Sequence, residues 1–204
     1  RFLGNPNDAP TKVHSRGHQL NYNYNFNNDW SLLAGANYRA ATLTGESSDA
    51  ELSPSRQSLF DDGTTLTRQH RYRDYESEDV SVRFELSGQF DIASITNHVL
   101  FGADAYEYEL GTGLYRYRGG YGTYTIDIHE PDYTPIEGPE MGMQYENNEE
   151  QRAYGLYIQD QLDITDNLKV MVGLRFDEIE QDIFETKSGV ASHSKKNRIS
   201  PRFG

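Results

Sequence analysis

The sequence predicts an all-β protein: an antiparallel up-and-down sheet of the kind that closes into a transmembrane β-barrel. Three observations predict it. Long segments alternate between apolar and polar residues, their connections are alternately short and long, and the composition is rich in tyrosine, phenylalanine and glycine (15, 9 and 18 of 204 residues). Alternation with a period of two indicates a strand with one apolar and one polar face. No run approaches the 18 or so apolar residues of a membrane-spanning helix.

The strongest strand pair spans residues 153–182. From Leu168 to Phe176 every second residue is apolar, and the looser run before it has apolar residues on one face except at Asp160. The polar residues 165–167 between these runs indicate a hairpin turn. Asp160 fits an apolar face that meets lipid if it lies near the headgroups or at a β-bulge, where a charge costs little.

The first part of the chain predicts a loop followed by two strands. Residues 1–15 are rich in turn-forming residues, and residues 17–26 and 30–44 alternate. The second alternating run is about 15 residues long, whereas strands of soluble proteins average about five or six. Residues 45–65 form a polar loop. Long strands, together with charges on the polar face, indicate a barrel with a large, water-filled lumen.

The middle of the chain predicts a further strand pair. Residues 66–78 are charged on both faces, and the two-faced segment 80–90 follows them. A turn near residues 91–96 leads to a strand over residues 99–105. The remaining elements are then an irregular segment over residues 111–150, the hairpin, a polar loop over residues 187–194 and a strand that begins at Lys195.

The connections place short turns and long loops at opposite ends of the strands. The turns near residues 27, 91 and 166 are short, and the loops are those over residues 45–65, 111–150 and 187–194. Outer-membrane barrels have this arrangement, with strands that are apolar outside and polar inside. Phe26, Trp30 and Phe90 lie next to short turns, where an interfacial aromatic girdle is expected.

Composition excludes some function classes and leaves others open. The net charge of −13 argues against a nucleic-acid partner. A soluble β-sandwich also alternates, but loops of about 40 residues are unusual in it. A passive pore, and an outer-membrane hydrolase on a smaller barrel, remain alternatives. The sequence has no cysteine and no nucleophile elbow, so no catalytic residue and no enzymatic activity are predicted.

No metal site or cofactor is predicted. The six histidines are scattered, and none belongs to a spaced motif of metal ligands. They are His14, His18, His70, His98, His129 and His193.

Several segments resemble, in the same order, the ferrichrome-receptor branch of the TonB-dependent siderophore receptors. The segments are RFLGNPND from Arg1, NYNYNFNNDWSLLAGANYR from Asn21, NHVLFGADAY from Asn97, YGLYIQDQLDITDNLKVMVGLRFD from Tyr154 and ISPRFG from Ile199. The resemblance implies that residues 1–204 form about seven strands of a 22-stranded barrel. The plug domain and the other strands then lie outside this sequence.

The resemblance also implies a location and partners. The barrel stands in the lipid of the Gram-negative outer membrane. It binds a ferric siderophore, whose iron stays inside its chelator, and imports it with energy from the TonB–ExbB–ExbD complex through the plug. Cobalamin or a glycan are other cargoes of such receptors.

The expected ligand-binding residues lie in the most tyrosine- and arginine-rich part of the chain. They are Tyr115, Arg116, Tyr117, Arg118 and Tyr121. Aromatic rings supply contact area and guanidinium groups pair with anions. The resemblance points to Tyr115 and Tyr117 in particular. Alternatively, these residues have no role in ligand binding, because tyrosine and arginine are common on solvated loops. The loop over residues 45–65 has no tyrosine, unlike that of related receptors, which leaves the ligand class open.

Overall fold

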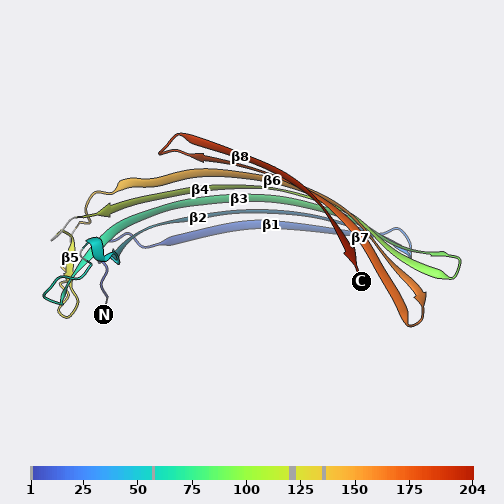
Figure 1. Ribbon diagram of the computed structural model, residues 1–204, viewed down its shortest axis with the longest axis horizontal. Coiled ribbons are helices and arrows are strands. Elements are labelled where there is room, and N and C mark those ends of the chain that lie inside the picture. The colour runs from blue at the N-terminus through green and yellow to red at the C-terminus, as the bar shows by residue number, and fades with distance from the viewer. Residues whose placement is uncertain (1, 57, 120–122, 135–136) are drawn as a thin grey trace.

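A computed structural model describes residues 2–56, 58–119, 123–134 and 137–204, and these form one curved antiparallel sheet (Figure 1). Its long strands are β1 (Lys12–Asn25), β2 (Trp30–Ala50), β3 (Thr65–Ile92), β4 (Ile95–Arg118), β6 (Gly142–Thr165), β7 (Leu168–Glu185) and β8 (Val190–Phe203). They pair in sequence order, and the short strand β5 (Thr125–Asp127) pairs with β3. A single 3₁₀ turn, η1 (Pro54–Arg56), follows β2.

The topology confirms the predicted up-and-down sheet. Each long strand pairs with the next one in the chain, and β1 and β8 each pair on one side only within the described residues. The sheet is therefore an open part of a barrel wall. No helix in the same part of the chain is long and apolar enough to cross a membrane.

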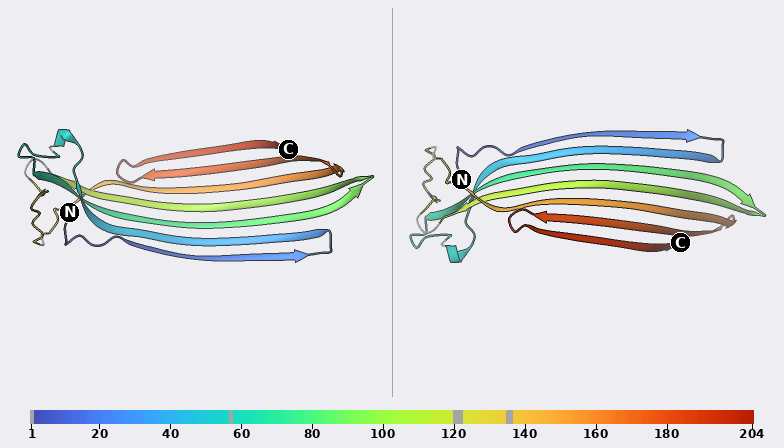
Figure 2. Two further views of the ribbon diagram at one scale, coloured as in Figure 1. Left: turned by 90° about the horizontal axis from the view of Figure 1, so that it is seen from below. Right: turned by 90° about the horizontal axis from the view of Figure 1, so that it is seen from above.

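The short turns after β1, β3 and β6 lie at one end of the sheet, and the longer connections after β2 and β4 lie at the other, as predicted (Figure 2). The prediction of a polar loop over residues 187–194 was wrong, because residues 186–189 form a tight turn between β7 and β8. At one end the turns are tight: Asn27 Oδ1 accepts hydrogen bonds from the backbone of Asp29 and Trp30, and Thr165 Oγ1 accepts from Asn167 and Leu168. The other end, called the loop end below, carries η1, β5 and the chain that precedes β1. In an outer-membrane barrel the loop end faces outside the cell.

The strands are longer than predicted. β1 begins at Lys12 instead of residue 17, β2 continues to Ala50, and β8 begins at Val190 instead of Lys195. The prediction of an irregular segment over residues 111–150 was wrong at both ends, because β4 continues to Arg118 and β6 begins at Gly142. Near the loop end both faces carry polar residues. The apolar alternation therefore stops although the backbone pairing continues.

No second layer of the described residues covers the apolar face of the sheet. Phe84, Leu156 and Leu174 lie on this face and are 53%, 57% and 49% exposed. Among the described residues, Val99 and Ile126 are the only apolar side chains classed as buried. A soluble sandwich would bury such a face against a second sheet. The exposed face instead matches a barrel wall whose solvent is lipid.

Aromatic residues gather where the short turns begin. The ring of Trp30 stacks on that of Phe90, with centroids 6.4 Å apart and planes inclined by 2°. Gly88 makes this possible, because a Cβ at that position would lie 2.4 Å from the Trp30 ring. Phe26 meets Tyr24 edge to face at 5.1 Å. These rings lie at the level where the sequence predicts the girdle.

Asp160 lies on the apolar face, between Val99 of β4 and Val172 of β7. The register shift of the β6–β7 pair falls between Asp163 and Thr165, so Asp160 is not itself at a bulge and that explanation was wrong. Its position close to the hairpin turn is consistent with the other explanation, a place near the headgroups.

We predict that residues 1–204 alone do not form a stable monomer in water. Two open edges and an uncovered apolar face favour association with other chains. Analytical ultracentrifugation and urea unfolding of the purified segment, without detergent, would show aggregates and no cooperative transition. A monomer that unfolds cooperatively would contradict the lipid-facing assignment.

Candidate ligand-binding site

The face opposite the apolar one is polar and hollowed. It carries two hollows of about 920 Å³ each, one over the middle of the sheet and one closer to the loop end. In the middle, Arg175 donates two hydrogen bonds to Asp104 (2.7 and 2.9 Å) and a third to Asp177 (2.7 Å). The Tyr157 hydroxyl donates to Glu85, which also pairs with Arg83. Charges on this face are thus paired with one another.

Two glycines leave room for this network. A Cβ at Gly102 would lie 2.0 Å from the ring of Tyr157, and one at Gly155 would lie 2.1 Å from the guanidinium of Arg175. Any side chain at these positions would displace Tyr157 or Arg175. The glycines therefore let long polar side chains lie flat across the sheet, which keeps the hollow open.

Closer to the loop end, the same face carries four arginines, here called the arginine cluster: Arg71, Arg73, Arg116 and Arg118. The β3–β4 register brings them together, because Arg71 pairs with Arg116, and Arg118 and Arg73 lie one step along the same face on either side. Two carboxylates neutralise part of this charge. Glu51 makes two contacts of 2.9 Å with Arg118, and Asp49 lies 3.5 Å from Arg71.

The arginine cluster keeps a positive excess in a chain of net charge −13. Arg73 donates a hydrogen bond to an uncharged partner, the hydroxyl of Ser47, at 3.2 Å. Burial lowers the pKa of Arg116, and the neighbouring charges of Arg118 and Arg71 lower it further. Guanidinium groups stay protonated in proteins. The crowding therefore means that an anion bound here would relieve repulsion as well as form ion pairs.

Two tyrosines adjoin the arginine cluster. Tyr75 and Tyr145 lie on the polar face, and their hydroxyl groups are 2.8 Å apart. Sequence reasoning missed both, because it placed Tyr75 in a segment without a face and Tyr145 in an irregular one. Every second residue of a strand lies on the same face. Counting back from Arg83 in steps of two through β3 would therefore have placed Tyr75, Arg73 and Arg71 on the polar face.

The structure separates the residues predicted to bind ligand. Arg116 and Arg118 lie on the polar face, whereas Tyr115 and Tyr117 lie on the opposite face of β4. The Tyr115 hydroxyl donates to Glu146 at 3.0 Å, and its ring lies 6.1 Å from that of Tyr72. Tyr121 lies outside the described residues. A ligand role for these five residues remains a prediction, which the geometry favours for the two arginines.

The amino-acid sequence also places the chain among known proteins. The sequence profile of the family described as "TonB dependent receptor-like, beta-barrel" matches residues 1–204. The chain belongs to this family. The metal-pseudopaline receptor CntO of Pseudomonas aeruginosa is 30% identical over 210 residues, which cover all of this chain and 29% of that receptor. This TonB-dependent receptor segment thus spans less than a third of the length of that relative.

Solved structures agree on the fold. The siderophore receptor PiuA from Acinetobacter baumannii superposes with a TM-score of 0.74 at 16% identity, over 99% of this chain and 31% of that one. The ferric-catecholate import receptor Fiu from Escherichia coli gives 0.73 at 14% identity, over 100% and 31%. At such identities the likeness concerns the fold alone.

A testable pH effect concerns the loop that joins β2 to β3 and carries Glu51. Asp62 accepts hydrogen bonds from the hydroxyl of Thr65 (2.6 Å) and from the backbone of Thr65 and Thr64 (2.8 Å each), which lower its pKa to about 2. Because the folded pKa is depressed, the stabilisation is complete above the ordinary value of 3.8 and is lost as the pH falls toward 2.

Hydrogen exchange of the full-length receptor would measure this effect. Corrected for intrinsic rates, protection of the Thr64 and Thr65 amides should persist at pH 4 and fall as the pH approaches 2. In the Asp62→Asn variant it should be lower and independent of pH. Loss of protection already centred near pH 4 in the wild-type receptor would contradict the hydrogen-bonded geometry.

Proposed function

We propose that the chain is part of an outer-membrane transporter that imports a metal–chelate complex. In this proposal residues 1–204 form part of the barrel wall, a plug closes the barrel, and the TonB–ExbB–ExbD complex supplies the energy. Membership of the TonB-dependent receptor family supports this. So does the relative CntO, which is described as a receptor for metal-pseudopaline.

The single observation that carries the choice of ligand is the arginine cluster. It lies on the polar face near the loop end. In the proposed barrel this face lines the lumen, and an incoming ligand reaches it from the loop end. Its positive excess fits an anionic complex, since carboxylate-like oxygens accept paired hydrogen bonds from guanidinium groups. The adjoining Tyr75 and Tyr145 offer rings with polar tips to the same ligand. A ferric siderophore carrying negative charge is the leading cargo.

Other cargoes would match the arginine cluster less well than an anionic chelate. A neutral glycan would gain no ion pairs from the arginine cluster, and cobalamin offers no cluster of acids to match it. A passive pore is the other alternative, and it would conduct ions without a ligand. Planar-bilayer recordings of the full-length receptor should show a closed barrel under the proposal, whereas a steady open-channel conductance would favour the pore.

Growth of the source organism tests the cargo. Strains with and without the gene would be supplied with single ferric siderophores, or other metal chelates, as the sole metal source. We expect the deletion to abolish growth on one anionic chelate and to leave growth on the others unchanged. Equal growth of both strains on every chelate would contradict the proposal.

Charge substitutions then test the site with the chelate so identified. Replacing Arg116 by Gln should weaken binding about tenfold, or about 1.4 kcal/mol, because one charge-assisted contact is lost. Replacing Glu51 by Gln should strengthen binding, because the Glu51 carboxylate, which competes with the chelate for Arg118, is replaced by a neutral amide. Isothermal titration calorimetry at low and high salt would measure both, and the differences should shrink at high salt.

The matched control is Arg152→Gln. Arg152 is an exposed arginine that pairs with Glu107 and lies on the opposite face of the sheet. This variant should bind the chelate like the wild-type receptor. Equal weakening by the control and by Arg116→Gln would indicate a general charge effect and would reject the arginine cluster as the binding site.

A further inference from the structure

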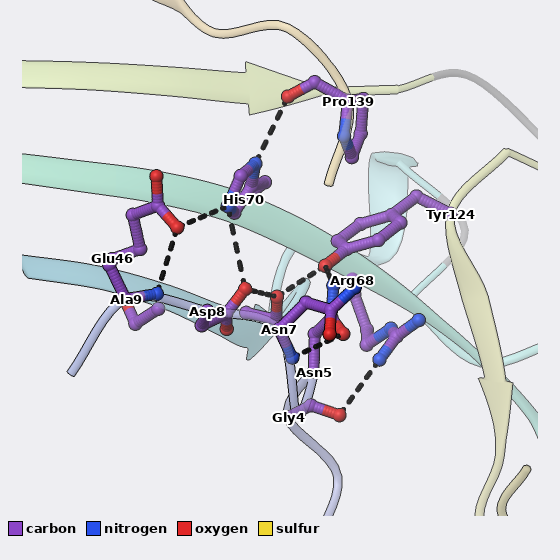
Figure 3. Close-up of polar contacts among 12 residues, drawn as sticks. Gly4, Asn5, Asn7, Asp8, Ala9, Glu46, Arg68, His70, Tyr124 and Pro139 are labelled. Carbon is purple, nitrogen blue, oxygen red and sulfur yellow. Dashed lines mark hydrogen bonds and ion pairs between the residues drawn. The ribbon is translucent and has the colours of Figure 1, made fainter. Parts of the chain in front are cut away.

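Near the loop end of β3, on the face opposite the arginine cluster, His70 lies between two carboxylates (Figure 3). Its Nε2 atom is 3.5 Å from Asp8 Oδ1 and 3.9 Å from Glu46 Oε2. The three ligand atoms all lie within 4.8 Å of one another. His70 is 5% exposed, whereas Asp8 and Glu46 are partly exposed.

The hydrogen bond at the other ring nitrogen fixes which atom of His70 faces the carboxylates. Nδ1 lies 3.0 Å from the carbonyl oxygen of Pro139, which can only accept, so Nδ1 carries a proton. In the neutral imidazole Nε2 is then a bare lone pair. It is buried, has no hydrogen-bond partner among the described residues, and points at two anions. A lone pair aimed at two carboxylates is unfavourable unless a cation lies between them.

A protonated imidazole is the simpler cation, and the distances argue against it. A charge-assisted N–H···O bond to one carboxylate would close to about 2.7–2.9 Å. Here neither carboxylate approaches that closely. Ligands held about 2.1 Å from a tetrahedral metal ion are about 3.4 Å apart. The His70–Asp8 distance of 3.5 Å is close to this value, and the His70–Glu46 distance of 3.9 Å exceeds it by about 0.5 Å.

Neighbouring groups orient the two carboxylates. Asp8 Oδ1 accepts from the Ser48 hydroxyl at 3.0 Å, and Glu46 Oε2 accepts from the backbone of Ala9 at 2.9 Å. The chain also covers the imidazole, because a Cβ at Gly138 would lie 2.3 Å from its ring. In known metal sites, hydrogen bonds of this kind hold the coordinating side chains in the orientation that the metal needs.

The nearest cation is directed elsewhere. The guanidinium of Arg68 lies over the Tyr124 ring, 4.3 Å from its centroid, and donates to the carbonyl oxygens of Gly4 and Thr125. It therefore does not fill the space between Asp8, Glu46 and His70, although its charge moderates that of Asp8.

We propose that Asp8, Glu46 and His70 bind a divalent transition-metal ion of the Zn²⁺ type, separate from the transported chelate. One nitrogen and two carboxylate oxygens suit such an ion, whereas Ca²⁺ and Mg²⁺ prefer oxygen ligands alone. The ion joins the segment before β1 to the ends of β2 and β3, under the chain at Gly138. It is a structural clamp on the loop end. The sequence shows no motif for it, because the pairing of β2 with β3 brings residues 46 and 70 together and the segment before β1 adds Asp8.

The test uses the full-length receptor in detergent, stripped with EDTA and titrated with Zn²⁺ in the absence of any chelator cargo. Calorimetry and metal analysis after gel filtration give the number of ions bound. His70→Gln and Asp8→Asn should each lose one equivalent of Zn²⁺ relative to the wild-type receptor. Hydrogen exchange in residues 5–9 should slow when Zn²⁺ is added to the wild-type protein and not when it is added to the variants.

The control is a second group of the same composition. Glu180, Asp182 and His193 also lie close together, but Asp182 and His193 are exposed and joined by a direct contact of 2.8 Å. His193→Gln should keep the equivalent that His70→Gln loses, and circular dichroism should show that both variants are folded. A wild-type receptor that binds no more Zn²⁺ than His70→Gln, with the same exchange rates in residues 5–9, would overturn the proposal.

Discussion

The constraint on which the rest of the structure depends is that backbone groups in hydrocarbon must pair with one another. Lipid offers no hydrogen bonds, so each strand that crosses it needs a partner on both sides. The result is a ladder in which each long strand from β1 to β8 pairs with the next one in the chain. This explains a fold with almost no buried apolar side chains in its described part. The strands are long because the ladder continues after the chain has left the lipid.

The same ladder connects the fold to the candidate site. Alternation carries the polar face without a break from Arg83 to Arg71 along β3, and the register with β4 sets Arg116 beside Arg71. The two faces therefore diverge in role near the loop end. One face carries the arginine cluster and its tyrosines, which line the lumen in the proposed barrel, and the other carries His70 with its two carboxylates. Residues adjacent in sequence, such as Tyr115 and Arg116, belong to different surfaces for this reason.

Sequence reasoning succeeded where one face meets lipid. There the period of two is visible in residue type, so the strands at residues 80–90 and 168–176 and the tight turns were predictable. It failed where both faces meet water: residues 111–118 pair as strand without any apolar pattern, and the prediction of a loop there was wrong. The face of Tyr145 required the register of pairing with β4. The grouping of Asp8, Glu46 and His70 required contacts between three segments that no local spacing encodes.

The central claim is that alternate residues of one strand face lipid and lumen. Residues 1–204 contain no cysteine. In the full-length receptor, with any cysteine outside these residues replaced by serine, single cysteines can be placed at residues 80–85 of β3, spin-labelled and examined in liposomes. Collision rates with dissolved oxygen report exposure to lipid. The account predicts high rates at Val80, Val82 and Phe84 and low rates at Ser81, Arg83 and Glu85. Uniform rates, or the opposite alternation, would contradict it.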